Sequence, residues 1–420
     1  MRAQRHPNAS WRAVRERGEP SMRSPLLPIF LTVFVDVLGL TLILPLLPYY
    51  AKDYGASDFQ ATLLTSVYAA AMFVSGPMLG RLSDRIGRKP VLLLSQVGTL
   101  IGWLTLAAAH NLEMLFVGRI IAGLTAGNLS IAQAYISDVT KPNEERTQAF
   151  GFFGIAFGTG FLLGPGITAL LTYLFRDHPD PLFKYKPPTL AAAGLSLAAI
   201  LLTAFFLPAR KPAAQTGRRL SGMAEYLSRP GPRKHLAEFF FFSVSFAALT
   251  GALGVYLKRQ FNYELHQAGL IFGLSGLIGA IVQGGLLKRL VKRLGEERLT
   301  AIGLGTMVLG YCLLGVATNL GFLLVLVVLG SFGAAVVRPS VTTLITRSVA
   351  KEEQGTVLGV SQSLGSLAQI VGPAAAGWLI DRNQVVMYGL LCAGFSLLGL
   401  LLALQRRGEP RPVEQAPVEG

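Results

Sequence analysis

Asp36 is an acidic residue in the middle of a long apolar stretch, residues 26–50. An ionisable side chain within a membrane is costly and by default marks a transport pathway or a proton relay. Burial away from water disfavours the ionised carboxylate, so Asp36 could bind and release a proton near physiological pH. It is the only acid deep in any apolar stretch, and the five histidines all fall in termini, loops or the ends of such stretches. We therefore predict that Asp36 carries protons; the alternative is a fixed structural partner for a nearby arginine or helix end.

Two arginines, Arg119 and Arg338, also fall within apolar stretches. Helical spacing would place Ser130 (i+11) and Gln133 (i+14) near the face of Arg119, a polar stripe that predicts a water-filled cavity. Arg119 could couple to Asp36, so that protonation changes the charge presented to a substrate, or it could be purely structural. Arg338 could contact the substrate or extend its charged end to the membrane surface.

Gln362, Ser366 and Gln369 are spaced i, i+4 and i+7, so they share one helix face. Such a row either lines a cavity or forms hydrogen bonds between helices, and we favour the second interpretation. Gln362 and Gln369 remain candidate cavity residues.

Gly160 and Gly164 are spaced i and i+4 and are followed by Pro165. The spacing of two small residues lets a second helix approach closely, and the proline removes a backbone donor and bends its helix. This cluster therefore predicts helix packing first and function second.

Residues 80–89 form the segment GRLSDRIGRK, which combines four cations, one carboxylate and two glycines between two apolar stretches. The link is too short to fold alone and must act at a membrane surface. A carboxylate at the end of one helix can lie against the N-terminus of another, where free N–H groups and the helix dipole favour an anion. The alternative is a simple cationic anchor.

The helices that position these residues are indicated by composition. The chain has 420 residues, is 51% hydrophobic and 15% charged, and has a mean hydropathy of +0.49, whereas soluble domains are about a quarter charged. Apolar stretches of about 20 residues, enough to cross a bilayer as helices, recur along the chain. We predict an all-α polytopic membrane protein with twelve spans: 26–50, 59–80, 91–109, 112–137, 148–174, 189–207, 237–257, 267–287, 299–317, 320–346, 356–380 and 385–404.

The net charge of +15 is distributed unevenly. Lys and Arg favour alternate loops by roughly four to one, as the positive-inside rule requires. Both termini are therefore predicted to be cytoplasmic, and nucleic acid is not an expected partner. The two cysteines, Cys312 and Cys392, both lie in apolar stretches, so neither a disulfide framework nor a metal site is expected.

The two halves of the chain repeat each other at an offset of about 208 residues, as in Gly164-Pro165 and Gly372-Pro373. Six spans in each half give both halves the same orientation, related by an axis along the membrane normal. The predicted organisation is a basic leader (1–24), an N-terminal six-helix bundle (25–207), a cytoplasmic linker (208–235), a C-terminal six-helix bundle (236–404) and a tail (405–420).

Twelve spans in two halves, with Gly80-x-Leu-x-Asp84-Arg85-x-Gly87-Arg88-Lys89 after the second span, resemble the major facilitator superfamily. A degenerate copy occupies 285–295, with Lys292 where the carboxylate would stand. Three further blocks resemble the drug:proton antiporters, in particular the tetracycline-efflux-like branch: DVLGLTLILPLLP from Asp36, GRIIAGLTAG from Gly118 and GFLLGPG from Gly160. The last block departs from the antiporter signature where Thr168-Ala169 replace a glycine pair.

The resemblance implies that Asp84 holds the two halves together in the outward-open state, through the start of the eleventh span near Gly355. It also implies that Arg85 and Arg88 pair with a carboxylate at the end of the fourth span, for which Asp138 is the candidate. The fourth and tenth spans, with Arg119 and Arg338, would line the cavity. The expected conformational switch comprises Gly80, Asp84, Arg85, Gly87, Arg88, Lys89 and Asp138.

The preferred hypothesis is a secondary transporter in the cell (inner) membrane that exports small amphipathic compounds in exchange for protons. The alternatives are a proton symporter or facilitator that imports a small, possibly anionic, metabolite, and a non-transporting receptor on the same scaffold. No phosphate-binding loop and no nucleophile–base pair is present in the sequence, which disfavours ATP coupling and enzymatic activity. We expect no cofactor, a monomer, and partners limited to the substrate, protons and the lipid bilayer.

Overall fold

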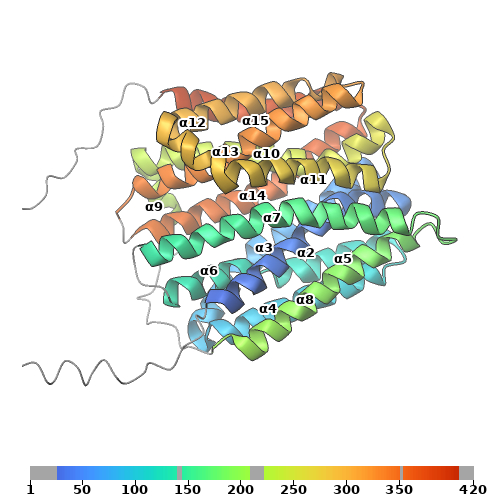
Figure 1. The fold of residues 1–420 in the computed structure, drawn as a ribbon, viewed down its shortest axis with the longest axis horizontal. Coiled ribbons are helices and arrows are strands. Elements are labelled where there is room, and N and C mark those ends of the chain that lie inside the picture. The colour runs from blue at the N-terminus through green and yellow to red at the C-terminus, as the bar shows by residue number, and fades with distance from the viewer. Residues whose placement is uncertain (1–25, 140–143, 209–221, 351–352, 406–420) are drawn as a thin grey trace, which may run out of the picture.

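The computed structural model describes residues 26–139, 144–208, 222–350 and 353–405, and all its regular elements are helices. The helices lie roughly side by side, and the two halves of the chain form neighbouring bundles (Figure 1). The expected leader (1–24), nearly all of the tail and much of the linker fall outside the described residues. The bounds predicted for the five segments therefore stay predictions.

The N-terminal half contains six units of membrane-spanning length, the fourth of which is split into two helices. In chain order the helices are α2 (Leu26–Asp53), α3 (Asp58–Ile86), α4 (Arg88–Ala107), α5 (Leu112–Leu124), α6 (Asn128–Val139), α7 (Glu144–Leu174) and α8 (Lys186–Phe206), with a short 3₁₀ turn at Phe183–Tyr185 before α8.

The C-terminal half follows the short helix α9 (Gly222–Ser228). Its helices are α10 (Pro230–Phe261), α11 (Leu265–Ile281), α12 (Leu287–Cys312), α13 (Leu320–Arg347), α14 (Gln354–Asp381) and α15 (Val385–Leu404). A π-helical segment, Val282–Leu286, joins α11 to α12, and a 3₁₀ turn, Leu314–Val316, follows α12.

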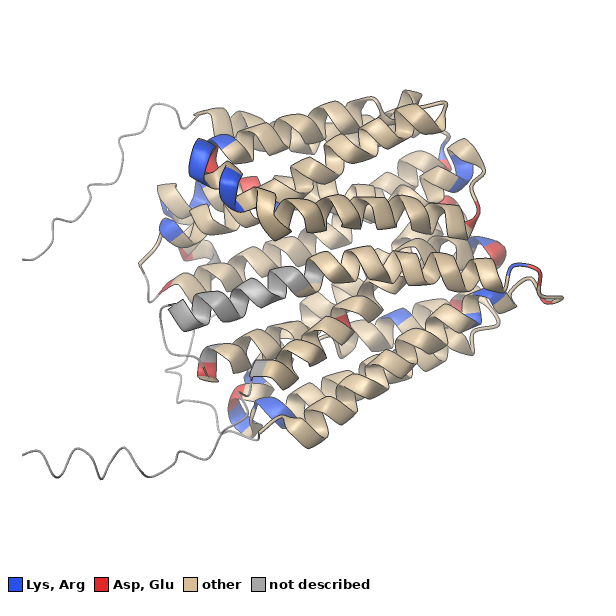
Figure 2. Ribbon diagram, viewed as in Figure 1, with Lys and Arg blue, Asp and Glu red and all other residues tan. Residues whose placement is uncertain are grey.

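Each of the twelve expected spans has a helical counterpart. Within the described residues, ten segments are long and apolar enough to cross a membrane. One of them, Leu265–Val316, runs for 52 residues and contains the expected eighth and ninth spans, and the fifth span appears as the shorter apolar helix Gly158–Leu174. The protein is an all-α polytopic membrane protein, as predicted, with charged residues gathered at the two ends of the bundle (Figure 2).

Side-chain caps define where several helices begin. Ser57 and Gln60 form a reciprocal capping box at the start of α3, because each side chain accepts a hydrogen bond from the other residue's backbone N–H. Asn111 caps α5 and Asn319 caps α13, in both cases by accepting from the N–H three residues later. These two asparagines are 208 residues apart.

The repeat is also visible in the backbone. Gly87 has φ 102° and ψ 158°, and Gly295, 208 residues later, has φ 74° and ψ 163°. This region is disfavoured for residues with a Cβ, so glycine is needed at both turns. Gly87 lies between α3 and α4, and Gly295 marks a kink inside α12 where two helical segments meet.

The same offset relates two close helix contacts. A Cβ on Gly164 would lie 2.9 Å from the backbone N of Leu42 on α2, and a Cβ on Gly372 would lie 2.8 Å from the backbone N of Ala248 on α10. The first helix of each half therefore packs against the fifth helix of that half at an equivalent glycine.

The most extensive contacts between the halves are those of α3 with α14 and of α7 with α11. Both contacts depend on glycine. A Cβ on Gly377 of α14 would lie 1.8 Å from the Thr62 hydroxyl of α3, and a Cβ on Gly276 of α11 would lie 2.2 Å from the Phe161 carbonyl of α7. Close backbone approach through small residues is the usual way helices associate in membranes, where the surrounding lipid is as apolar as the helices.

Candidate functional site

Asp36 lies on α2, ten residues from the first residue of this 28-residue helix, roughly 15 Å along its axis. Protein atoms surround its carboxyl group, although part of the side chain remains accessible. Its hydrogen-bond partner is the side chain of Asn128, the first residue of α6. The sequence reasoning did not identify Asn128; its position at a helix start directly after Gly127 was the available signal.

Arg119 on α5 is buried, with 4% of its surface exposed. Its guanidinium carbon lies 4.0 Å from the centroid of the Tyr68 ring on α3, within the range of a cation–π interaction. Its Nε also points to the Leu64 carbonyl, 3.5 Å away on the same helix. Tyr68 is a second residue that the sequence reasoning missed.

Among the ion pairs of the described residues, none joins Asp36 directly to Arg119. Tyr68, whose ring contacts the Arg119 guanidinium, also interacts electrostatically with Asp36. Asp36, Tyr68, Arg119 and Asn128, here called the Asp36 cluster, therefore connect four helices through one acid, one cation and two neutral polar groups. The Asp36 carboxyl in this arrangement can bind a proton, and the loss of its negative charge would change the electrostatic environment of Tyr68 and Arg119.

The expected continuous helix through Arg119 and Gln133 is wrong. Helix α5 ends at Leu124 and α6 begins at Asn128, so the i+11 and i+14 spacing does not carry from one to the other. Ser95 of α4 stabilises the break, because its hydroxyl donates to the Thr125 carbonyl and accepts from the Gly127 N–H at 2.8 Å. Gln133, half-buried on α6, is thus placed independently of Arg119.

Arg338 lies on α13, nine residues before the last residue of the helix. Its side chain is accessible to water although protein atoms surround it. Such a side chain is accessible to a small molecule that enters the bundle. The position therefore suits contact with a bound molecule, one of the two roles expected from the sequence.

Gln362 and Gln369 on α14 are both exposed and neither makes a side-chain hydrogen bond to the rest of the described chain. The interhelical hydrogen bonds that we favoured from the sequence are therefore not present. Leu367 and Val371 are exposed on the opposite side of the same helix. Because the apolar side suits lipid, the glutamine side suits an internal cavity.

Arg88 is the centre of the switch segment. Its buried guanidinium donates to Asp138 at 2.9 Å, to Asp84 at 2.5 Å and to the Ser83 hydroxyl at 2.7 Å. These contacts join the end of α3, the start of α4 and the end of α6. Ser83 was not among the predicted switch residues.

Arg85 does not pair with Asp138 as the resemblance implied. It is exposed and makes no ion pair with the described residues, because Arg88 alone reaches the Asp138 carboxylate. Lys89 donates to the Ala204 carbonyl of α8 at 2.8 Å. A Cβ on Gly80 would meet open space, so close packing does not require glycine there in this conformation.

Gly160, Gly164 and Pro165 lie on α7 with the two glycines against α2. Thr41 of α2 donates to the Gly160 carbonyl at 2.7 Å. Thr168, one of the two residues that depart from the antiporter signature, donates to the Leu42 carbonyl at 2.8 Å. The departure therefore adds a hydrogen bond between α7 and α2.

Glu238, expected at the edge of the span 237–257, is a second buried acid. Helix α10 begins at Pro230, seven residues before the expected start, and Glu238 is 0% exposed. The Nδ1 atom of His235 lies 3.6 Å from its carboxylate. Asp36 was expected to be the only acid deep in a span, but Glu238, in the third turn of α10, is also buried.

The fold and the switch segment define a membrane transporter of the Major Facilitator Superfamily. The sequence model of that family matches residues 29–289 and 236–420, and the chain belongs to it. The chain is 30% identical over 395 residues to the tetracycline resistance protein, class C, of Escherichia coli, covering 91% of this chain and 96% of that protein. The comparisons confirm the resemblance predicted from the sequence motifs.

Solved structures agree with this assignment. The crystal structure of the human organic anion transporter MFSD10 (TETRAN) matches with a TM-score of 0.69 and 25% identity, over 92% of this chain and all of that one. A mutant of the nucleoside transporter NupG matches with a TM-score of 0.72 over 91% of this chain and 99% of that one, at 16% identity, a likeness that shows the fold alone.

Proposed function

We propose that this protein exports small amphipathic compounds of the tetracycline type in exchange for protons. The observation that carries the proposal is the Asp36 carboxyl, held inside the bundle by Asn128 and next to Tyr68, in a chain similar to tetracycline resistance proteins over nine tenths of its length. An acid in this position can be protonated and deprotonated without disturbing a salt bridge. The energy comes from the proton gradient, with no cofactor.

The coupling proceeds through charge. With Asp36 ionised, its negative charge offsets the buried Arg119 through Tyr68; with Asp36 protonated, the positive charge of Arg119 is uncompensated. A proton and a cationic or polar drug group therefore compete for the same carboxylate. One elementary charge moved across 100 mV provides about 2.3 kcal/mol, which sustains a gradient of roughly fiftyfold.

The end of the bundle that contains residues 80–89, here called the motif end, faces the cytoplasm of the cell membrane in this proposal. The excess of Lys and Arg in the loops of that end supports it. The described chain begins and ends there, at α2 and α15 (Figure 1), so both termini would be cytoplasmic. We expect one chain to suffice for transport.

Everted membrane vesicles test this proposal. Addition of tetracycline to acidified vesicles should release protons when the wild-type protein is present, as reported by a pH-sensitive dye. Asp36→Asn should abolish this exchange while the protein remains inserted and folded, and Asp177→Asn, an exposed loop acid, should retain it. Undiminished drug–proton exchange in Asp36→Asn would show that Asp36 is not the proton carrier.

A second candidate function is the transport of small organic anions. Two cations within membrane-spanning helices support it: Arg119 is buried and Arg338 is exposed on α13. The similarity to MFSD10, described as an organic anion transporter, also supports it. Uptake of a labelled organic anion that depends on Arg338 and is lost in Arg338→Gln, without any drug–proton exchange, would favour this function over drug export.

A further inference from the structure

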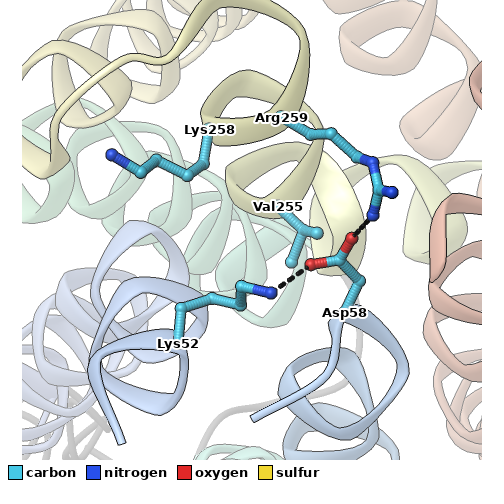
Figure 3. Close-up of a pocket in the computed structure, with 5 residues that line it drawn as sticks. All are labelled: Lys52, Asp58, Val255, Lys258 and Arg259. Carbon is cyan, nitrogen blue, oxygen red and sulfur yellow. Dashed lines mark hydrogen bonds and ion pairs between the residues drawn. The ribbon is translucent and has the colours of Figure 1, made fainter. Parts of the chain in front are cut away.

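Asp58, the first residue of α3, lies at the end of the bundle opposite the motif end. Only 3% of its surface is exposed. Its carboxylate pairs with Lys52 at 2.8 Å and with Arg259, and both cations point at it from opposite sides (Figure 3). A cavity of about 130 Å³ beside these residues is also lined by Val255 and Lys258.

These contacts cross from one half of the protein to the other. Asp58 and Lys52 belong to the N-terminal half, whereas Arg259, at the end of α10, belongs to the C-terminal half. The Asp58 backbone N–H also donates to the carboxylate of Asp381, the last residue of α14, at 3.0 Å. Arg259 is held in place by Asn383, to whose side chain its Nε donates at 3.1 Å.

The ion pairs described at the motif end each join residues of the same half. Arg88 pairs with Asp84 and Asp138, all within the N-terminal half. Arg229 pairs with Glu353, and Arg347 pairs with Glu296, all within the C-terminal half. The charged contacts between the halves that the structure describes are therefore those around Asp58.

Helix α3 carries a carboxylate near each end, Asp58 and Asp84. In this conformation Asp58 is engaged with the opposite half, and Asp84 is engaged with Arg88 of its own half. Each carboxylate also has a basic neighbour within its own half, Lys52 for Asp58 and Arg88 for Asp84. Separation of the halves at either end would thus leave the carboxylate paired.

We propose that Asp58, Arg259 and Asp381 form a charged lock that closes this end of the transporter, and that Lys52 holds Asp58 when the lock opens. A buried carboxylate that loses all its partners is strongly destabilising. Lys52 lowers this barrier, because the Asp58 carboxylate keeps one cation when Arg259 and Asp381 move away with the opposite half. The lock is thus stable and still reversible.

The proposal rests on alternating access, which is part of the proposed function, but its test measures a conformation and not transport. Nitroxide labels at His110 and Gln384, exposed loop positions of the two halves at this end, report the separation by pulsed electron–electron resonance. The purified full-length chain is used, with Cys312→Ser and Cys392→Ala to remove the native thiols.

The parent protein should show mainly the short distance. Arg259→Gln should raise the ratio of long to short distances roughly tenfold, as expected for loss of one charge-assisted hydrogen bond. Asp58→Asn should shift the ratio in the same direction. Arg259→Gln keeps Asp58 paired with Lys52 and should fold even if Asp58→Asn does not, so it carries the test alone if necessary.

Lys258→Gln is the matched control, because Lys258 is the neighbour of Arg259, carries the same charge and lines the same cavity without contacting Asp58. It should leave the distance distribution unchanged. The lock is overturned if Arg259→Gln gives the parental distribution, or if Lys258→Gln shifts it equally. Drug–proton exchange that fails in wild type, with the distance shift intact, would refute the proposed function and leave the lock standing.

Discussion

The guanidinium of Arg119 is stacked on the ring of Tyr68, 4.0 Å from its centroid, and Tyr68 is also the residue that connects Arg119 electrostatically to Asp36. A buried cation without a carboxylate partner is costly, and the face of the aromatic ring offsets part of that cost. The positive charge therefore remains available inside the bundle. In the proposed coupling, the response of Arg119 to the protonation of Asp36 depends on this ring.

Replacement of Tyr68 tests the role of the ring. Tyr68→Phe keeps the aromatic face and should retain most drug–proton exchange, whereas Tyr68→Leu should lose it and lower the free energy of unfolding by about 1–2 kcal/mol. Thermal unfolding of the purified protein and the vesicle assay measure the two effects. Equal behaviour of the two variants would show that the cation–π contact is unimportant.

Arg88 should be the residue on which the stability of the switch segment depends. Arg88→Ala would leave the Asp138 carboxylate, of which 11% is exposed, without its cation, and should destabilise the protein by roughly 3 kcal/mol. Arg85→Ala removes an equal charge from an exposed site and should change the unfolding free energy by less than about 0.5 kcal/mol.

Thermal unfolding of these two variants in the same detergent provides the comparison. The assignment of Arg88 as the central residue fails if Arg85→Ala is the more destabilised protein. Both variants can also be assayed for drug–proton exchange, since Arg85 remains available for contacts in another conformation.

The two glycines with positive φ should be equally sensitive to substitution. Gly87→Ala and Gly295→Ala would each force a Cβ into a disfavoured backbone region, at a cost of about 1–2 kcal/mol. Gly80→Ala and Gly305→Ala add a methyl group in open space within a helix and should be neutral or slightly stabilising. Unfolding free energies of the four variants check this, and a loss confined to Gly87→Ala would mean that the two turns are not equivalent.

The ion pair between Arg229, which follows α9, and Glu353, which precedes α14, should weaken in acid. The hydrogen bond from Arg229 at 2.7 Å lowers the pKa of Glu353 below its usual value. Because the folded-state pKa is lowered, the stabilising effect is present at neutral pH and is lost as the pH falls through that lowered pKa. Hydrogen exchange should show greater protection of the first turn of α14 in wild type than in Glu353→Gln at pH 7, and no difference at pH 3. A difference that persists at pH 3 would contradict this.

The fold was largely predictable because apolar length and charge bias are local properties of the sequence. All twelve spans had helical counterparts, and the offset between Gly87 and Gly295 reappeared as a shared backbone conformation. Helix ends were harder to predict. Glu238 was misplaced because α10 begins at Pro230, where a proline, a glycine and charged residues concealed a helix start.

The charged residues of the candidate site could be predicted from the sequence, but the neutral residues that contact them could not. Asp36, Arg119 and Arg88 stand out in a sequence because charge is rare in apolar surroundings. Tyr68, Asn128 and Ser83 do not, since tyrosine, asparagine and serine occur in many helices without a special role. Their importance depends on which helices are neighbours.

The sequence alone determined the class of protein: the spans follow from the hydrophobic requirement of the bilayer, and the two halves follow from the repeated residues. Only the tertiary structure decided the pairings, such as Arg88 rather than Arg85 with Asp138, and Asp58 with Arg259 of the opposite half. The physical reason is that an ion pair depends on a distance of a few ångströms between helices. The packing of glycines such as Gly276 and Gly377 at the interface between the halves sets that distance.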